Sequence, residues 1–249
     1  MFDPEPVRLD RRTLLRTGAL AGLVLAASAS SRSALADSGP LKIGVIGAGH
    51  IGSTIGSLWV KSGHPVMFSS RHPDELKSLV DGLGSLAKSG TVGDAIDFAD
   101  VVFIAVPYLA YPQIGKDYGS KLSGKVVLDA GNATERRDGS ELATEAKEEG
   151  IGVTSAKYLP GARIVRAFNT MSYKYFASEA NRAGDRMAIP IAGDDKEALT
   201  MASTLVHDAG FDPVVIGGLA RAKDFQQGSP LYGLQLTAAE MRQKADALK

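Results

Sequence analysis

Three glycines near the start of the chain have the spacing of a phosphate-binding turn. Gly47, Gly49 and Gly52 follow an apolar run and precede a stretch with helical periodicity. In such a turn the first glycine permits a tight bend, the second lets the backbone approach a pyrophosphate, and the third lets helix and strand pack closely. The first N–H groups of the helix would point at the phosphates. We therefore expect a dinucleotide site on Gly47, Ala48, Gly49, His50, Ile51 and Gly52.

The residues after the second expected strand predict which dinucleotide binds. An NAD site usually has an acidic residue there, which accepts hydrogen bonds from the ribose 2′-OH. This chain has Ser70, Arg71 and His72 instead. A serine can donate a hydrogen bond to a 2′-phosphate, and an arginine can pair with it through two N–H groups. We expect NADP(H) in preference to NAD(H); the alternatives are a solvated Arg71 at a helix start and a His72 in a surface loop.

Two further segments are expected to face the nicotinamide end of the dinucleotide. In open α/β sheets, ligands bind outside the carboxyl ends of the strands. Val106 and Pro107 end the apolar run 101–106, so they should border the nicotinamide ribose. Asn132 follows another apolar strand and offers both a donor and an acceptor, although an ordinary turn containing Asn explains it equally well.

From residue 41 onward, short apolar runs alternate with longer amphipathic stretches. This pattern predicts an α/β fold of the Rossmann type, a doubly wound, mostly parallel sheet with helices on both faces. Strands are expected near 41–46, 65–69, 101–106, 125–129, 163–168, 187–192 and 213–216, and helices near 50–62, 73–80, 109–120, 138–149, 173–179, 194–209, 219–228 and 237–249. Glycines and a proline between 150 and 162 suggest a weak division between an NADP-binding core (37–160) and an α/β extension (161–249) that completes the sheet and the acceptor site.

The first 36 residues are typical of an export signal. Arg11 and Arg12 precede an uncharged stretch over 17–31, and Ala34-Leu35-Ala36 has the small-x-small pattern of a signal peptidase site. The segment resembles a twin-arginine signal, so we expect the twin-arginine machinery as a partner, cleavage after Ala36, and a periplasmic or otherwise exported location. The alternatives are an amphipathic helix or a membrane anchor, but the uncharged stretch is shorter than the roughly 20 residues that span a bilayer.

Composition excludes several classes of function. Without residues 1–36 the chain has 23 basic and 25 acidic residues, which leaves no electrostatic case for binding nucleic acid or an anionic membrane. The absence of cysteine excludes thiolate nucleophiles, disulfides and Cys-based metal sites. The four histidines lack the spacing of metal ligands, so no metal is expected, and His64 and His207 are expected at the surface.

Several motifs together resemble a known family. They are Gly47-Ala-Gly-His-Ile-Gly52, Ser69-Ser-Arg71, Ala105-Val-Pro107, Arg166-Ala-Phe-Asn-Thr170 and Ile191-Ala-Gly-Asp-Asp195. In this order they resemble the coenzyme F420-dependent NADP reductases and, especially at 166–170, the reductase domain of STEAP-type metalloreductases. The resemblance covers nearly all of 41–236.

The resemblance implies hydride transfer between NADPH and a deazaflavin (F420-like) or flavin acceptor. Such a transfer needs proximity and exclusion of water more than acid–base groups, so no catalytic residue is expected. By resemblance Asn169 would help place the nicotinamide or its acceptor, and 217–223 with 230–236 would close over the redox partner. Phe168 is expected to pack in the core and Asp194 and Asp195 to cap a helix.

The resemblance also has departures and leaves other functions open. Family members often have a basic residue a few positions past the Ser-Arg pair, where this chain has Asp74 and Glu75, and the segment after Gly217 diverges. One alternative is an NADP(H)-dependent dehydrogenase or imine reductase acting on a small substrate. Another is a non-catalytic NADP(H)-binding module. A homodimer is common in these families.

Overall fold

The computed structural model describes residues 39–248, and the chain from Pro40 onward forms one compact unit. The expected twin-arginine signal lies outside the described residues. Within them, no helix is both long and apolar enough to cross a bilayer.

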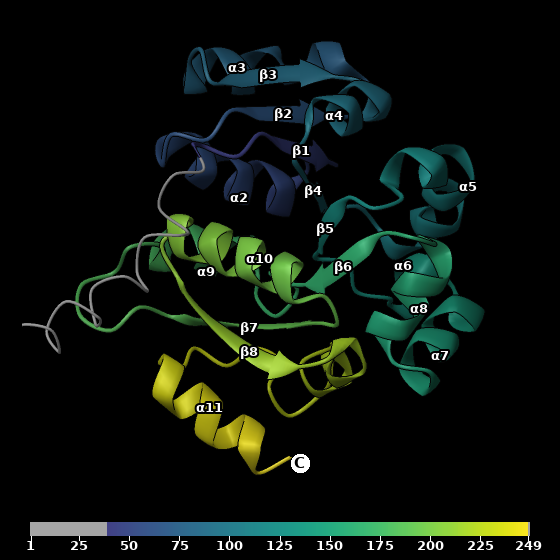
Figure 1. Ribbon diagram of the computed structural model, residues 1–249, viewed down its shortest axis with the longest axis vertical. Helices are drawn as coiled ribbons and strands as arrows, with labels where there is room; N and C mark the ends of the chain where they lie inside the picture. The colour runs from purple at the N-terminus through teal and green to yellow at the C-terminus, as the bar shows by residue number, and fades with distance from the viewer. Residues whose placement is uncertain (1–38, 249) are drawn as a thin grey trace, which may run out of the picture. The chain divides into compact units, whose positions relative to one another are not determined.

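The sheet has eight strands in the order β3-β2-β1-β4-β5-β6-β7-β8. All neighbours pair in parallel except β6 and β7, which are antiparallel. Figure 1 shows β3 at the top of the view and β8 below, with the C-terminal helix beyond it. This arrangement confirms the predicted doubly wound, mostly parallel α/β fold. The strands are β1 Ile43–Ile46, β2 Val66–Ser69, β3 Ala87–Gly90, β4 Val101–Ile104, β5 Val126–Asp129, β6 Arg163–Arg166, β7 Ala188–Gly193 and β8 Asp212–Gly217.

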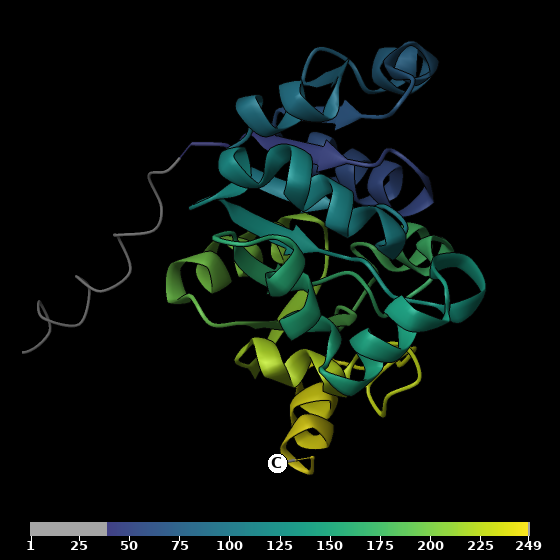
Figure 2. The same cartoon turned by 90° about the vertical axis from the view of Figure 1, so that its right-hand side faces the viewer.

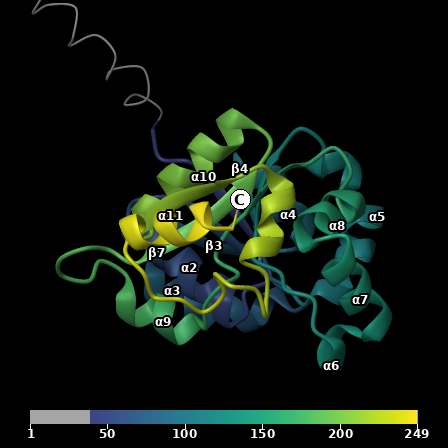
Figure 3. The same cartoon turned by 90° about the horizontal axis from the view of Figure 1, so that it is seen from below.

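Helices cover both faces of the sheet, which is why its central strands are apolar throughout. A parallel strand buried on two sides has no solvent face, so β1 and β4 contain no charged residue and are fully buried. Ile43 and Val45 pack on one face, whereas Ile46 packs on the other. Figures 2 and 3 show the helices of 111–158 gathered on one side, with α9 and α10 on the other side in Figure 3.

The helices alternate with the strands along the chain. They are α2 His50–Lys61, α3 Lys77–Leu83, α4 Val92–Phe98, α5 Tyr111–Leu122, α6 Glu135–Asp138, α7 Ser140–Glu148, α8 Ile151–Tyr158, α9 Tyr173–Glu179, α10 Lys196–Asp208 and α11 Ala238–Asp246, with 3-10 helices η1 Pro73–Leu76, η2 Tyr108–Ala110 and η3 Leu219–Asp224. Helices α2, α3, α9 and α10 pack on one apolar cluster, and α4, α5, α7, α8 and α11 pack on the other.

The core on the first face is built around aromatic rings. Phe168 meets Trp59, Phe103, Phe176 and Phe211 edge-to-face at centroid distances between 5.7 and 6.2 Å. Edge-to-face pairs add to the apolar area they bury. The expected role of Phe168 in core packing is confirmed.

Several sequence expectations about individual elements were wrong. Strand β3, helix α4 and helix α8 were not expected, and the helix expected over 219–228 is instead the 3-10 helix η3. A division near 150–162 stays a prediction, although α8 fills that stretch and β5 pairs directly with β6 across it. His64 is not at the surface: it is 6% exposed, and its ring nitrogens lie 3.2 Å from the Leu41 carbonyl oxygen and 3.0 Å from the Asp208 carboxylate. His207 is exposed, as expected.

Candidate functional site

The glycine-rich turn lies between β1 and α2, where the strand order reverses from β1 to β4. Such a reversal leaves a crevice at the carboxyl ends of the strands. Gly47 has φ of +97°, and a β-carbon there would lie 2.5 Å from Cγ1 of Val106. Its amide and that of Ala48 donate to the Ser69 carbonyl, at 3.2 and 3.1 Å. The turn is therefore held against the ends of both β2 and β4.

The other two glycines of the turn differ in the space available for a β-carbon. A β-carbon on Gly52 would lie 1.9 Å from the carbonyl oxygen of Gly47, so this glycine is needed for the helix to pack on the turn. A β-carbon on Gly49 would meet no protein atom within 4 Å. Gly49 also has φ of −72°, which any residue adopts. Nothing within the described chain thus requires glycine at position 49, and a ligand that approaches the backbone closely would.

The start of α2 has the properties of an anion site. No side chain caps its N-terminus, and no acidic residue stands in its first turn. Uncapped N–H groups and the helix dipole both favour negative charge there. The ring of His50, the first helical residue, stacks on Tyr173 with centroids 4.2 Å apart. The exposed turn is thus flanked by an aromatic pair that joins α2 to the start of α9.

The end of β2 presents the residues expected to recognise a 2′-phosphate. Ser70 Oγ accepts the backbone N–H of His72 at 3.1 Å, which shapes a short turn, and its own hydroxyl hydrogen stays available. Arg71 is exposed and makes no hydrogen bond or ion pair with residues 39–248. An arginine without a carboxylate partner is free to bind an anionic ligand. The residues of the turn and of the β2 end together fit a dinucleotide that carries a 2′-phosphate.

The side of the crevice that is expected to receive the nicotinamide is formed by the segments after β4, β5 and β6. Val106 packs against the turn and the exposed Pro107 follows it. Asn132 Nδ2 donates to the Asn169 carbonyl at 2.7 Å, and Asn169 Nδ2 donates to the Asn132 side chain at 3.3 Å and to the Phe225 carbonyl at 3.1 Å. Asn132 is partly exposed, whereas Asn169 is 2% exposed. Asn169 therefore connects its own loop with the loops that contain Asn132 and Phe225. Asn132 lies at the surface of the crevice.

A buried ion pair underlies this loop, and sequence reasoning missed it. Arg166 Nη1 lies 2.5 Å from Asp129 Oδ1, and both side chains are fully buried. Asp129 accepts the N–H of Gly131 at 2.8 Å, and Arg166 donates to the carbonyl of the same residue. Tyr111 donates to Asp129, and burial together with this carboxylate raises the pKa of the tyrosine. Asp129 and Arg166 therefore fix the position of Gly131, the residue before Asn132. Charged ends on two adjacent apolar strands, β5 and β6, were the available signal.

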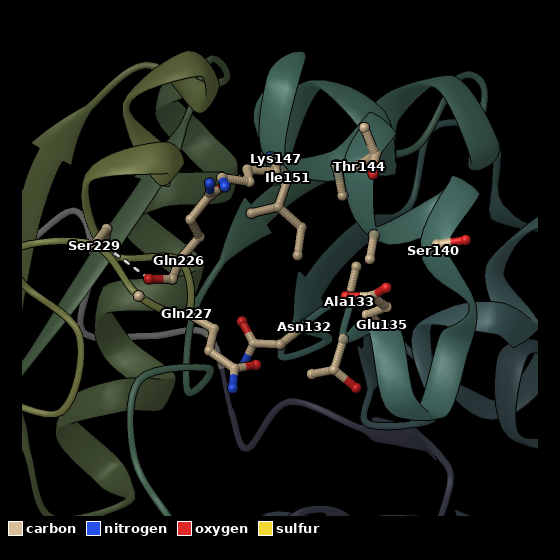
Figure 4. Close-up of a pocket in the computed structure, with 14 residues that line it drawn as sticks. Asn132, Ala133, Glu135, Ser140, Thr144, Lys147, Ile151, Gln226, Gln227 and Ser229 are labelled. Carbon is tan, nitrogen blue, oxygen red and sulfur yellow. Dashed lines mark hydrogen bonds between the residues drawn. The ribbon is translucent and has the colours of Figure 1, made fainter.

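A cavity of about 550 Å³ opens beside Asn132, between α7, α8 and the loop after η3. In Figure 4, Asn132 and Gln227 lie at the bottom of the cavity, Ser140 and Thr144 on the right, and Lys147 at the top. Its volume is in the range of small-molecule sites. Part of its lining, 226–229, lies between the two segments expected to close over a redox partner.

Comparison with known proteins shows which proteins this chain is similar to. Residues 42–133 match the family described as NADP oxidoreductase, coenzyme F420-dependent. Over 185 residues the chain is 28% identical to Metalloreductase STEAP3 of Rattus norvegicus, covering 74% of this chain and 36% of the rat protein. The chain is therefore similar to NADP-dependent oxidoreductases over residues 42–133.

A second curated relative and two solved structures extend the comparison. The putative protein YjhV of Escherichia coli is 41% identical over 56 residues, 22% of this chain and 41% of that protein, so the oxidoreductase spans well under half the length of both curated relatives. A hypothetical protein from Sinorhizobium meliloti has 29% identity and a TM-score of 0.69, covering 80% of this chain and 95% of its own. A putative F420-dependent NADP-reductase from Arthrobacter has 20% identity and a TM-score of 0.60 over 74% of this chain and 87% of its own, which shows a shared fold.

The remaining expected residues of the oxidoreductase have structural roles. Asp195 caps α10 by accepting the N–H of Ala198 at 2.8 Å, and Asp194 accepts the N–H of Leu219 at 2.8 Å. The prediction of helix capping is confirmed for Asp195, whereas Asp194 holds the start of η3. Among residues 39–248, no group of three His, Asp or Glu side chains is placed to hold a metal ion.

Proposed function

We propose that this oxidoreductase binds NADPH along the carboxyl edge of β2, β1, β4 and β5 and passes its hydride to an organic acceptor that binds next to Asn132 and extends into the adjoining cavity. The observation that carries the proposal is the open space at Gly49 in front of an uncapped helix, together with an exposed Arg71 that has no partner in residues 39–248. The nicotinamide supplies the hydride. The chain supplies a site that holds one orientation and excludes water.

Each part of the crevice has a separate task in this proposal. The N–H groups at the start of α2 bind the pyrophosphate, and Ser70, Arg71 and His72 bind the 2′-phosphate. Val106 and Pro107 border the nicotinamide ribose. Asn132, held by Asn169 and by the peptide that Arg166 and Asp129 grip, orients the nicotinamide side. No residue acts as a general acid, because the hydride moves directly from the nicotinamide ring to the ring of the acceptor.

A deazaflavin or a flavin is the acceptor we propose. The family description that matches residues 42–133 names coenzyme F420, a deazaflavin. A cavity of about 550 Å³ can take a substantial part of such a molecule.

A small substrate is the second candidate, and the chemistry of the cavity favours it. The lining side chains carry mostly hydroxyl and amide groups, including Thr134, Thr144, Gln226 and Gln227. A small carbonyl or imine compound with several polar groups would fit these partners. A dehydrogenase of this kind would need a proton donor, which the hydride acceptor proposed above does not need.

Titration with NADPH and NADH, followed by addition of a deazaflavin or flavin, tests the proposed function. Tight NADPH binding and a loss of absorbance at the nicotinamide band on adding the acceptor would support it. Tight binding without oxidation by any deazaflavin or flavin would reject this acceptor class and leave a small-substrate reductase or a nucleotide-binding module. Equal affinity for NADH would reject the 2′-phosphate site.

We also propose that residues 1–36 direct twin-arginine export to the periplasm. The support is the pattern of Arg11, Arg12 and Ala36, together with the ability of that route to move folded proteins with bound nucleotide. Replacing both arginines by lysine should abolish appearance of the shorter, processed protein outside the cytoplasm. Processing of the double variant at the normal rate would contradict the proposal.

A further inference from the structure

The cavity beside Asn132 has an unusual lining for a site that receives a flat ring. None of the described residues that line it is aromatic. Its apolar contribution is limited to three alanines and Ile151, whereas Ser140, Thr144 and Ser229 contribute hydroxyl groups. Small-molecule sites are more often lined by apolar and aromatic side chains. The lining is therefore suited to a hydroxylated chain and offers no side chain on which a tricyclic ring could stack.

Lys147 lines this cavity and has no partner among residues 39–248. It lies on the last turn of α7 and makes no ion pair or hydrogen bond with the described chain. Other lysines nearby are engaged: Lys157 pairs with Glu145. Glu135 is the only acid among the described residues of the lining, and Figure 4 places it at the bottom right, away from Lys147 at the top. The upper part of the cavity thus offers hydroxyl donors and an available positive charge.

We infer that this cavity binds the hydroxylated side chain of the acceptor, with Lys147 pairing a terminal anion, a phosphate or a carboxylate. The inference rests on the proposed function, because it concerns the same acceptor. It explains how a cavity with a polar lining can serve an acceptor with an aromatic ring. The ring lies outside the cavity, toward the nicotinamide side of Asn132, and the side chain of the acceptor lies between α7 and α8. Affinity then depends on the side chain of the acceptor as well as on its ring.

Three flavins with the same ring and different side chains test this inference. Lumiflavin has no polyol chain, riboflavin has the chain without an anion, and FMN has the chain with a phosphate. Each is titrated with the protein in the presence of NADP⁺, which cannot reduce them, and binding is followed by flavin fluorescence. NADPH oxidation with the same three acceptors is measured separately. The variants are Lys147→Met, Thr144→Val and the control Lys116→Met, which alters an exposed lysine of α5 outside the cavity.

The expected order of affinity is FMN, then riboflavin, then lumiflavin. Lys147→Met should lower the affinity for FMN about three- to ten-fold, as expected for an exposed charge-assisted pair, and leave the affinity for riboflavin unchanged. Added salt should lower the affinity for FMN but not the affinities for riboflavin and lumiflavin. Thr144→Val should lower the affinities for FMN and riboflavin but not the affinity for lumiflavin. Lys116→Met should change none of the three affinities.

The inference is overturned if lumiflavin binds as tightly as FMN, if Lys147→Met leaves the ratio of FMN to riboflavin affinity unchanged, or if none of the three flavins binds. Its failure is separable from failure of the proposed function. Oxidation of NADPH by all three flavins without dependence on the side chain keeps the function and rejects the inference. Binding that depends on the side chain without oxidation rejects the function and supports the inference.

Discussion

Individual glycines in the turn of this oxidoreductase have distinct physical roles. Gly47 is required by its positive φ and its contact with Val106, and Gly52 is required by the approach of α2 to the turn. Gly49 has neither constraint. A substitution can therefore remove the proposed phosphate contact without disturbing the fold.

Gly49→Val should abolish binding of both NADPH and NADH while the melting temperature stays within a few degrees of the wild type. The new β-carbon would have no protein atom within 4 Å, and the backbone φ of −72° suits valine. Isothermal titration and thermal unfolding measure the two effects. Gly52→Ala is the matched control: its β-carbon would overlap the Gly47 carbonyl, so it should destabilise the protein by about 1–3 kcal/mol or more. A folded Gly49→Val protein that still binds NADPH would remove the proposed site.

Arg71→Ala should weaken the binding of NADPH by about 1.5–3 kcal/mol, the range for a hydrogen bond to a charged group, and should have little effect on the binding of NADH. Arg71 is exposed and has no partner in residues 39–248, so its removal should leave stability unchanged. The affinities for both nucleotides are compared by titration. An equal loss for NADPH and NADH would show that Arg71 does not contact the 2′-phosphate.

At the level of residues, the sequence predicted local chemistry better than tertiary contacts. The spacing of Gly47, Gly49 and Gly52 and the basic end of β2 could be identified because each depends on a few adjacent residues. The link between Asn132 and Asn169 and the pairing of Asp129 with Arg166 depend on which strands are neighbours. That information is spread along the chain and no single motif contains it.

Among the elements, the central strands could be predicted and the edges could not. Apolar runs such as Val101–Ile104 are unmistakable, whereas β3 reads Ala-Lys-Ser-Gly and has exposed residues because it lies at the edge of the sheet. Helix α4 is short, and its signal in the sequence is the capping box formed by Thr91 and Asp94. Helix α8 was obscured by the glycines around it, which served as loop signals.

Helix α10 begins at an ion pair that should make stability depend on pH. Arg163 donates to Asp195 at 2.6 Å and 3.0 Å, and this pairing lowers the pKa of Asp195 from 3.8 to about 2. A carboxyl group with a lowered folded pKa stabilises the protein above its unfolded pKa, and that contribution is lost as pH falls from about 4 to about 2. Asp195→Asn should keep the cap to Ala198 and lose the ion pair.

The free energy of unfolding of wild type and Asp195→Asn should therefore differ near pH 7 and converge near pH 2. Denaturant titrations at several pH values measure this difference. Because the pair is partly exposed, high salt should also reduce the difference near pH 7. A difference that stays constant with pH would mean that the ion pair does not contribute.

For the whole molecule, the two halves of the sheet are joined by more than adjacent strands. Trp59 of α2 donates its indole N–H to the Leu205 carbonyl of α10 at 2.7 Å, and its ring contacts Phe168, which follows β6. On the other face, Asp129 of β5 and Arg166 of β6 form the buried ion pair. The proposed dinucleotide crevice and the cavity therefore belong to one packed body, and a substitution on one side of the β5–β6 pairing should affect the stability of the other side.

Arg166→Met should destabilise this body by about 3–5 kcal/mol, because it leaves the Asp129 carboxylate buried without its counter-ion. Combining it with Asp129→Leu should recover much of that loss, since two apolar side chains then replace the pair. Unfolding by denaturant is followed by Trp59 fluorescence, the signal of the only tryptophan, and by circular dichroism. Because Trp59 contacts both halves, the two signals should change together in every variant. A fluorescence transition at lower denaturant than the loss of helix would show that the halves unfold separately. A double variant no more stable than Arg166→Met would show that the fold depends on the hydrogen bonds to Gly131 and not on compensation of a buried charge.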